Sequence, residues 1–587
     1  MTPVQDLRSG QRTRVSEGRR RVVIEGVQPE LESGRFAIKR VAGETVAVEA
    51  DIFADGHAGV QCELLYRPEH ELGWRRAPME PLGNDRWRGE FRVSHPGSYF
   101  YTIEGWVDPR FATRYERELQ VWVDREKARF STWYELFPRS CSPVAGRHGT
   151  FRDCEAWLPY IADMGFDVLY LPPIHPIGRT ARKGVNGADS AQPDDVGSPW
   201  AIGSAEGGHK SILPELGTLA DFRRLLENAR KFGLEIALDI AFQCSPDHPY
   251  VTEHPEFFRK RPDGTIQSAE NPPKRYPDIY PFDFESPKWF ELWMELKSVF
   301  EFWIQQGVEI FRVDNPHTKT FLFWDWVINE LRRENPRVLF LSEAFTRPRV
   351  MHRLAKLGFS QSYTYFAWRN TKQELTDYFR ELTQPEVQEY FRANLWPNTP
   401  DILTRYLQEG GRPAFMIRLI LAATLGANYG IYGPAFELCE NTPREPGSEE
   451  YLHSEKYELK HWNVGAPGSL KGLIAQVNRI RQQNPALQSD RTLHFHEVDN
   501  PMLIAYSKVS DDRANTLLMV VNLDPVFRQT GWVNLDLGAL PPAQKGAFRA
   551  LDLLGGGDYY WSGPRNYVAL TPESSPAHIL LLEELGP

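Results

Sequence analysis

Eight short apolar runs that alternate with helical patterns constrain the fold of this 587-residue chain more than any other feature. The runs occupy residues 131–137, 166–174, 236–242, 308–314, 338–344, 362–368, 393–398 and 430–433. One intervening helix is predicted to begin at Thr218, with Asp221 three residues later in a capping-box-like start, and to end at Gly233. Strand–helix alternation of this length indicates a parallel sheet, and eight units predict a closed (β/α)8 TIM barrel, an α/β fold.

The segments on either side of the barrel have the pattern of β domains. Between residues 21 and 128, runs such as RVVIEGV and GSYFYTIEGWV are separated by turn signals, which predicts an N-terminal, immunoglobulin-like β-sandwich. Residues 490–587 return to runs such as LIAYSKV and TLLMVVNL, which predicts a C-terminal β-sandwich. We therefore expect the barrel at 129–489, with a long irregular loop or subdomain at 175–211 and a disordered arm at 1–20.

Composition excludes several classes of protein. Lys and Arg number 68 against 78 for Asp and Glu, and a formal net charge of −10 disfavours nucleic acid and membrane partners. Five scattered cysteines do not form a disulfide framework. The apolar stretch 419–433 is too short to span a bilayer, and the basic N-terminus has no apolar stretch behind it. We expect a cytoplasmic protein.

Three acidic residues stand where predicted barrel strands end, which is where barrels place their active sites. Asp314 ends FRVD, Glu343 ends VLFLSE, and Asp401 follows LWPNTP. A single carboxylate there could cap a helix or pair with an arginine, but three on one rim indicate chemistry. Paired carboxylates serve glycosyl transfer, in which one attacks or stabilises the anomeric carbon and the other protonates the leaving oxygen.

Four strings resemble signature regions of the α-amylase superfamily of retaining glycosidases: FRVDNPH (311–317), VLFLSEAFTRP (338–348), NTPD (398–401) and LDIAFQCSPDHP (238–249). The resemblance implies that Asp314 is the nucleophile, Glu343 the general acid/base and Asp401 the transition-state stabiliser. It also implies that Asp239 and Arg312 support the sugar subsite.

Two departures from ordinary amylases narrow the resemblance. Gln243-Cys244 stands where amylases usually have Asn-His, and Pro400 replaces the usual His before the third acid. Those histidines hold hydroxyls of the cleaved sugar, so an ordinary hydrolase is disfavoured. Together with ENPPKRYPDIY (270–280) and SEKYELKHWN (454–463), the sequence resembles one branch of the superfamily, the α-1,4-glucan:maltose-1-phosphate maltosyltransferases.

This resemblance implies contacts to a glycosyl phosphate. The leaving dianion needs cations and neutral donors, and the chain has no GxxxxGK[ST] loop to supply backbone amides. Without the resemblance, NPPKRY would be a surface turn and HSEKYELKH a solvated face. In the branch, the positions that match Asn271, Lys274, Tyr276 and Asn315 contact the phosphate, and those that match Lys183, Gln243, Lys456 and Tyr457 hold the maltosyl unit.

The implied reaction moves maltosyl units, with retention, from α-maltose 1-phosphate to the non-reducing end of an α-1,4-glucan and releases phosphate. No cofactor and no required metal are expected, and Trp368, Trp396 and Trp462 are candidates for an aromatic acceptor groove. Two alternatives stay open: a retaining α-glucan hydrolase or transglucosidase, and a non-catalytic glucan-binding protein. Members of the branch carry a helical insertion in the N-terminal sandwich that contributes to dimer contacts; the run DPRFATRYERELQVWV leaves no room for it, so homodimer formation is open.

Overall fold

A computed structural model describes residues 17–271, 274–541 and 546–585 of the chain. The chain divides into two compact units, residues 1–123 and 124–587. Most of the arm expected at 1–20 lies outside the described residues. Among the described helices, none combines the length and apolar character that a membrane crossing would need.

The first unit is a single curled antiparallel sheet in which most strands expose one face and bury the other. Residues Val46, Val48, Ala50 and Ile52 alternate inward along one strand and are at most 1% exposed, as expected for a half-buried strand. The connection between its last long strands contains a 3-10 turn (Pro109–Phe111) and a two-residue strand, with no helical insertion in these fully described residues. Its strands are β1 (Val22–Gln28), β2 (Ile38–Val41), β3 (Thr45–Ala54), β4 (Gln61–Pro68), β5 (Arg75–Gly83), β6 (Arg86–Arg92), β7 (Gly97–Trp106), β8 (Thr113–Arg114) and β9 (Leu119–Asp124), in the order β1-β3-β6-β5-β4-β7-β9-β2 with β8 beside β7.

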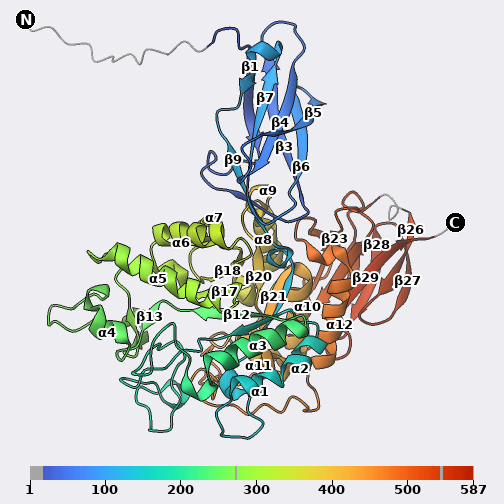
Figure 1. The fold of residues 1–587 in the computed structure, drawn as a ribbon. Helices are drawn as coiled ribbons and strands as arrows, with labels where there is room; N and C mark the ends of the chain where they lie inside the picture. Colours follow the sequence, from blue (N-terminus) through green and yellow to red (C-terminus); the bar gives the residue numbers. More distant parts are fainter. Residues whose placement is uncertain (1–16, 272–273, 542–545, 586–587) are drawn as a thin grey trace, which may run out of the picture. The chain divides into compact units, whose positions relative to one another are not determined.

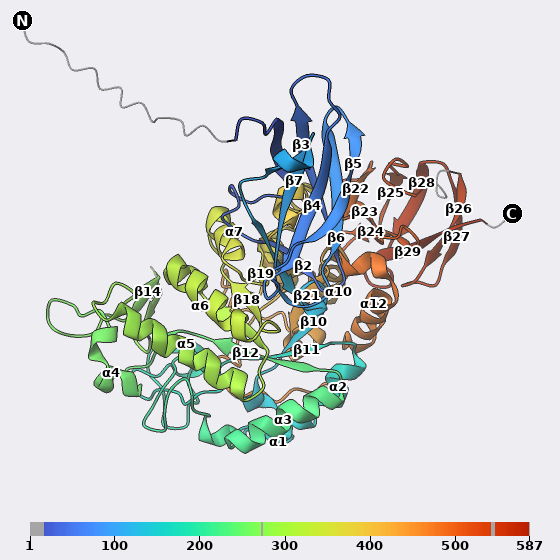
Figure 2. The ribbon, with the colours of Figure 1, turned by 45° about the horizontal axis from the view of Figure 1, so that its top comes forward.

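The second unit contains the predicted barrel, and all eight apolar runs are confirmed as its strands in sequence order. They pair in parallel around a closed ring, and several of its strands, β12, β18 and β21 among them, are labelled in Figures 1 and 2. The register places Asp239 opposite Arg312 and Asp314 opposite Glu343. The strands are β10 (Ser131–Glu135), β11 (Val168–Leu171), β12 (Glu235–Ile240), β17 (Ile310–Asp314), β18 (Leu339–Glu343), β19 (Gln361–Tyr363), β20 (Ala393–Leu395) and β21 (Asn428–Tyr432).

Amphipathic helices cover the outside of the barrel. α3 begins where the sequence predicts, because Thr218 and Asp221 form a reciprocal capping box, and its apolar stripe of Phe222, Leu225, Leu226 and Ala229 is buried. α10 is apolar over its second half, and that half is buried between the barrel and the C-terminal domain. The longer helices are α3 (Leu219–Lys231), α5 (Trp289–Gln305), α6 (Phe321–Glu334), α7 (Pro348–Lys356), α8 (Lys372–Leu382), α10 (Arg405–Leu425) and α12 (Lys471–Gln483).

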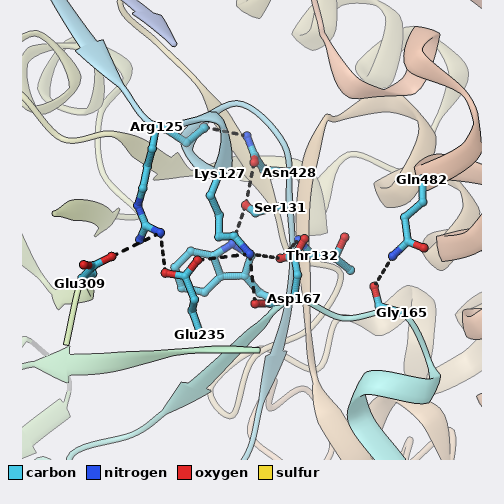
Figure 3. A network of polar contacts seen from close by, with 12 residues as sticks. Arg125, Lys127, Ser131, Thr132, Gly165, Asp167, Glu235, Glu309, Asn428 and Gln482 are labelled. Carbon is cyan, nitrogen blue, oxygen red and sulfur yellow. Dashed lines mark hydrogen bonds and ion pairs between the residues drawn. The ribbon is translucent and has the colours of Figure 1, made fainter. Parts of the chain in front are cut away.

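A polar network closes the end of the barrel where the strands begin (Figure 3). Arg125 donates to Glu235 at 2.5 Å and lies 3.7 Å from Glu309. Lys127 lies 3.4 Å from Glu235, and Asp167 accepts from the backbone N–H of Thr132 at 2.9 Å. These ion pairs and hydrogen bonds are expected to stabilise the folded barrel, since barrels have their active sites at the opposite end.

The C-terminal residues form an antiparallel β domain around its own apolar core. Leu518, Val520, Phe548 and Leu580 are fully buried members of that core. The strands are β22 (His494–Val498), β23 (Leu503–Val509), β24 (Thr516–Asn522), β25 (Gln529–Asn534), β26 (Ala547–Asp552), β27 (Asp558–Ser562), β28 (Arg565–Leu570) and β29 (Ala577–Glu584), in the order β27-β26-β29-β24-β23-β22-β25-β28.

Candidate active site

Arg312 gathers three predicted acidic residues at the end of the barrel where the strands terminate. Its Nη1 donates to Asp239 Oδ2 and to Asp314 Oδ1, both at 2.9 Å, and its Nη2 lies 3.5 Å from Glu343 Oε1. The arrangement follows from topology, because β12, β17 and β18 are neighbours and their in-register residues point the same way. Four of the residues predicted from the sequence are thus brought together around one guanidinium group.

Burial raises the pKa of the two carboxyl groups beside Asp314. Burial raises the pKa of Asp239 to about 7 against the opposing effect of Arg312, and the hydroxyl of Tyr170 donates to its Oδ2 at 2.5 Å. Burial also raises the pKa of Glu343, again opposed by Arg312 and reinforced by the charge of Asp314. A carboxyl group whose pKa is raised toward neutrality can donate a proton and take it back, as a general acid/base must.

Asn315 links the predicted nucleophile to the predicted acid. Its side-chain amide donates to Asp314 Oδ2 at 3.2 Å, and its backbone N–H donates to Glu343 Oε2 at 3.2 Å. Asn315 has a left-handed backbone conformation (φ 44°, ψ 51°), which Asn adopts more readily than most residues. One residue thus contacts both carboxyl groups, through its side chain and through its backbone N–H.

Lys319 is a cation of this site that the sequence reasoning missed. Its Nζ donates to the backbone carbonyls of Asp314 at 3.3 Å and Asn315 at 3.1 Å. Burial lowers the pKa of Lys319, while the charges of Asp314 and Glu343 act in the opposite direction. The only indication in the sequence was that Lys319 stands five residues after Asp314, and no motif identified in the sequence analysis includes this lysine.

The third acid, Asp401, stands on the loop after β20 and forms an ion pair with Lys456. Burial opposes the charged form of Lys456, but the carboxylate of Asp401 outweighs it and the pKa of Lys456 is raised. The side chain of Asp401 is half exposed, unlike that of Asp314. Two positions predicted separately, one acidic and one basic, therefore meet.

Hydrogen bonds tie the long loop at 175–211 to the segment that carries Lys456. The backbone N–H of Asn186 donates to Glu458 Oε1 at 3.0 Å, and the backbone N–H of His453 donates to Asn186 Oδ1 at 2.7 Å. This contact spans more than 260 residues of sequence and places the RKGVN string, with Lys183, against the string that contains Tyr457. The side chain of Lys183 is buried and pairs with Asp189 at 2.6 Å.

Two further side chains of the site, Trp200 and Asp278, were not predicted. Gln243 Nε2 donates to the backbone carbonyl of Trp200 at 3.1 Å, and Lys456 Nζ lies 5.5 Å from the centre of the Trp200 ring. Asp278 is buried, and the charges of Lys183 and Lys456 act on it. Trp200 Nε1 and Asp278 Oδ1 are buried polar atoms without a hydrogen-bond partner, which marks places where ligand hydroxyls could bind.

The string that carries the predicted phosphate contacts is a hairpin. β14 (Ala269–Asn271) pairs with β15 (Lys274–Tyr276), with Asn271 opposite Lys274. β13 (Gln243–Cys244), which follows β12 directly, pairs with β16 (Tyr280–Pro281) just after the hairpin. The side chains of Asn271 and Lys274 lie outside the described residues.

The prediction that Trp396 lines an acceptor groove is wrong. Trp396 is 3% exposed and stacks on Tyr363, with ring centres 5.0 Å apart and planes at 7°. It also contacts Trp133 and Tyr170 and fills the barrel interior. The other two candidates have partners for their indole N–H groups: Trp368 donates to Glu449 at 2.9 Å and Trp462 donates to Glu455 at 3.0 Å.

His209, Cys244 and His248 lie close enough to share a metal ion, with ligand atoms within 4.8 Å of one another. Their hydrogen bonds describe a different arrangement. His248 Nδ1 accepts from the backbone N–H of Tyr250 at 3.0 Å, so its proton is on Nε2, which contacts His209 Nδ1 at 3.0 Å. His209 Nε2 then donates to the carbonyl of Ala241 at 3.0 Å. Burial lowers the pKa of both histidines to about 3, and a neutral hydrogen-bonded pair that uses every ring nitrogen does not fit a metal centre.

Comparison with known proteins agrees with this geometry. The family model described as alpha-1,4-glucan:maltose-1-phosphate maltosyltransferase, domain N/S, matches residues 20–127, and the model described as GLGE, C-terminal, matches residues 495–582. The alpha-1,4-glucan:maltose-1-phosphate maltosyltransferases of Chlorobaculum tepidum and Methylacidiphilum infernorum are 49% and 48% identical to the chain. Each alignment of 647 positions covers 96% and 97%, respectively, of both partners. The alignments are longer than the chain, so these relatives contain residues that it lacks.

Solved structures show the same fold at low identity. An alpha-amylase from Lactobacillus plantarum matches 78% of this chain and 100% of its own, with a TM-score of 0.60 and 21% identity. An acarbose complex of the alpha-amylase from Geobacillus thermoleovorans gives a TM-score of 0.61 at 16% identity over 78% of this chain and 99% of its own. A cyclomaltodextrinase covers 90% of this chain and 97% of its own, with a TM-score of 0.57 and 15% identity.

Proposed function

The chain belongs to the α-1,4-glucan:maltose-1-phosphate maltosyltransferases, and from that premise we propose how its own residues divide the work of the transfer. The enzyme moves maltosyl units from α-maltose 1-phosphate to an α-1,4-glucan and releases phosphate. The observation that carries the proposal is the single guanidinium of Arg312, which holds Asp314 and Glu343 on neighbouring strand ends. Retention at the anomeric carbon and addition at the non-reducing end are part of the proposal.

In the first step, Asp314 Oδ attacks the anomeric carbon of the maltosyl unit, and the bond from that carbon to the phosphate oxygen breaks. Glu343 gives its proton to the departing oxygen, a role that its raised pKa supports. In the second step, Glu343 takes the proton from the acceptor hydroxyl, whose oxygen attacks the same carbon and releases Asp314. Two displacements restore the original configuration and divide one difficult reaction into two easier ones.

The remaining predicted residues bind the donor in this proposal. The hairpin at 269–276 supplies Lys274, Asn271 and Tyr276 to the phosphate, since a dianion needs cations and neutral donors. Lys456 and Asp401 hold sugar hydroxyls as a pair, and the loop that carries Lys183 lies against them. The charges of Lys183 and Lys456 act on the buried carboxyl group of Asp278, whose Oδ1 has no hydrogen-bond partner, and this supports a polar sugar subsite on this side.

Asp314→Ala tests the nucleophile assignment. We expect phosphate release from α-maltose 1-phosphate, measured with and without maltohexaose, to fall below detection while the circular dichroism spectrum is unchanged. Appreciable phosphate release by Asp314→Ala, or cleavage of maltoheptaose by the unmodified enzyme without phosphate, would contradict the proposal. A cytoplasmic location and homodimer formation remain predictions.

A further inference from the structure

An exposed aromatic surface lies on the first turns of α5 and α6, which pack side by side (Figures 1 and 2). Trp289 and Phe290 of α5 are 46% and 50% exposed, and Leu322 of α6 is 68% exposed. Phe290 and Trp326 are in ring contact across the two helices at 6.3 Å. Met294 and Trp326 each stand one helical turn from a member of the group. These five residues, Trp289, Phe290, Met294, Leu322 and Trp326, are the α5/α6 aromatic surface.

A chain of ring contacts leads from this surface toward the active site. Trp289 and Trp326 both contact Trp293, at 4.8 and 5.6 Å. Trp293 contacts Phe323 at 5.6 Å, and Phe323 contacts Phe284 at 5.4 Å. Phe284 lines a cavity of about 470 Å³. The exposed surface is therefore connected to this cavity through the buried rings of Trp293 and Phe323.

The cavity reaches the segment that follows Asp314 at the end of β17. Lys319 lines it and donates to the backbone carbonyl of Asp314. His317 lines it as well, and its Nδ1 is a buried atom without a hydrogen-bond partner. The remaining wall is mostly polar, with one further ring, and could offer hydrogen bonds to hydroxyl groups: Arg259, Gln267, Phe282, Asp283 and Glu285.

We propose that the α5/α6 aromatic surface binds the α-1,4-glucan chain at a distance from the catalytic centre, so that the polymer runs from the reacting end through the cavity and onto the helices. The proposal rests on the maltosyl transfer described above, which supplies the glucan. Glucose units present apolar C–H faces that stack on aromatic rings, and three of the five members of this surface are aromatic. The charged neighbours of this surface on the first turn of α5, Lys288 and Glu291, pair with each other at 2.9 Å, as a neutral ligand permits.

Position on the barrel distinguishes this surface from other exposed aromatic residues. α5 and α6 begin at the end of the barrel where the strands terminate, so their first turns lie at the catalytic end. By contrast, Trp532 and Tyr567 are an exposed ring pair in the C-terminal domain, 5.3 Å apart on β25 and β28. That pair also exposes two aromatic rings, but among the described residues no series of ring contacts connects it to the active site. It therefore provides a matched control.

The test compares Trp289→Ala/Phe290→Ala with Trp532→Ala/Tyr567→Ala. Phosphate release from α-maltose 1-phosphate is measured with glycogen and with maltotetraose as acceptors. We expect the first variant to raise the KM for glycogen about tenfold, or about 1.4 kcal/mol, while its kcat and KM with maltotetraose change less than about twofold. The control variant should keep both sets of constants. Each single substitution is measured too, so that a fold defect in the double variant is recognised by loss of activity with both acceptors.

Three outcomes would overturn the proposal. Unchanged glycogen kinetics in the double variant and in both single variants would show that the surface does not bind the polymer. An equal loss in the control variant would show that any exposed ring pair suffices. A change in oligomeric state by size-exclusion chromatography, with glycogen kinetics intact, would assign the surface to a second copy of the chain. None of these results would affect the transfer reaction itself, which the maltotetraose assay reports separately.

Discussion

Replacing Arg312 by methionine should remove most of the activity and a measurable part of the stability. The guanidinium makes two short charge-assisted hydrogen bonds, to Asp239 and Asp314 at 2.9 Å, and a 3.5 Å ion pair with Glu343. Each short bond contributes about 1.5–3 kcal/mol, so the pair contributes about 3–6 kcal/mol. This agrees with the cost of about 3–5 kcal/mol when one partner of a buried ion pair is removed. If about 3 kcal/mol of this is lost in the transition state, kcat falls about 150-fold.

The loss of stability should depend on pH, and its sign follows from the carboxyl groups. Arg312 lowers the pKa of both Asp239 and Glu343, which burial raises, so its removal raises both pKa values further above those of the unfolded chain. A carboxyl pKa that is higher in the folded state than in the unfolded chain destabilises the folded state at high pH. The extra destabilisation of the variant, relative to the unmodified enzyme, disappears once the pH is below the folded-state pKa values of both carboxyl groups. The free energy of unfolding of Arg312→Met should therefore approach that of the unmodified enzyme at pH 5 and differ most at pH 8.

Urea unfolding at pH 5 and pH 8, together with phosphate-release kinetics, measures both effects. Arg332→Met is the control, because Arg332 is equally buried and lies 3.3 Å from Asp124 at the opposite end of the barrel. That variant should lose stability but keep kcat per folded molecule. A destabilisation of Arg312→Met that is equal at the two pH values, or a fall in kcat of less than about tenfold, would refute the reasoning.

Two other substitutions test neighbouring groups. Glu343→Gln should lower the rate of single-turnover phosphate release about 10²–10⁴-fold. In the unmodified enzyme this rate should fall at alkaline pH as Glu343 loses its proton, and the variant should not show that fall. A variant that keeps the alkaline fall would exclude Glu343 as the acid. Lys456→Met should raise the KM for α-maltose 1-phosphate at least about tenfold with a smaller change in kcat, because its ammonium group pairs with Asp401 and is assigned to holding the maltosyl unit; a loss confined to kcat would contradict this assignment.

Local pattern predicted most of the fold. Continuous apolar runs mark parallel strands that are buried on both faces, which is why all eight barrel strands were found. Strands that were missed have a weaker pattern: β5 exposes most of its side chains, and β27 carries three exposed residues before Trp561. Such strands form because neighbouring strands offer hydrogen bonds. The alternation of apolar and polar residues in the sequence gives no information about that pairing. The N-terminal domain shows the same limit, since the expected sandwich is one curled sheet in which hydrogen bonding is continuous.

The active site was predictable where its residues end strands. Asp239 lies opposite Arg312 and Asp314 lies opposite Glu343 on adjacent strands, so the barrel topology places the four residues together. Lys319, Trp200 and Asp278 lie on loops, where neither periodicity nor topology fixes a position. For Trp396 the prediction was wrong in the opposite sense, because a buried residue was predicted to line a groove. An aromatic residue next to a strand end was assigned to a surface, although the barrel interior needs large side chains to fill it.

The net charge of −10 is a poor guide to what this site binds. A donor with a phosphate dianion would be repelled by that total if all charges acted equally. Charges on the protein surface are screened over about 8 Å at physiological salt, whereas buried cations are screened far less. Arg312, Lys319 and Lys456 are withdrawn from solvent close to the reacting carboxylates, and each is held by a carboxylate or carbonyl group. The local field at the donor is therefore set by these few groups, and a substitution among them should alter donor binding more than any change of surface charge.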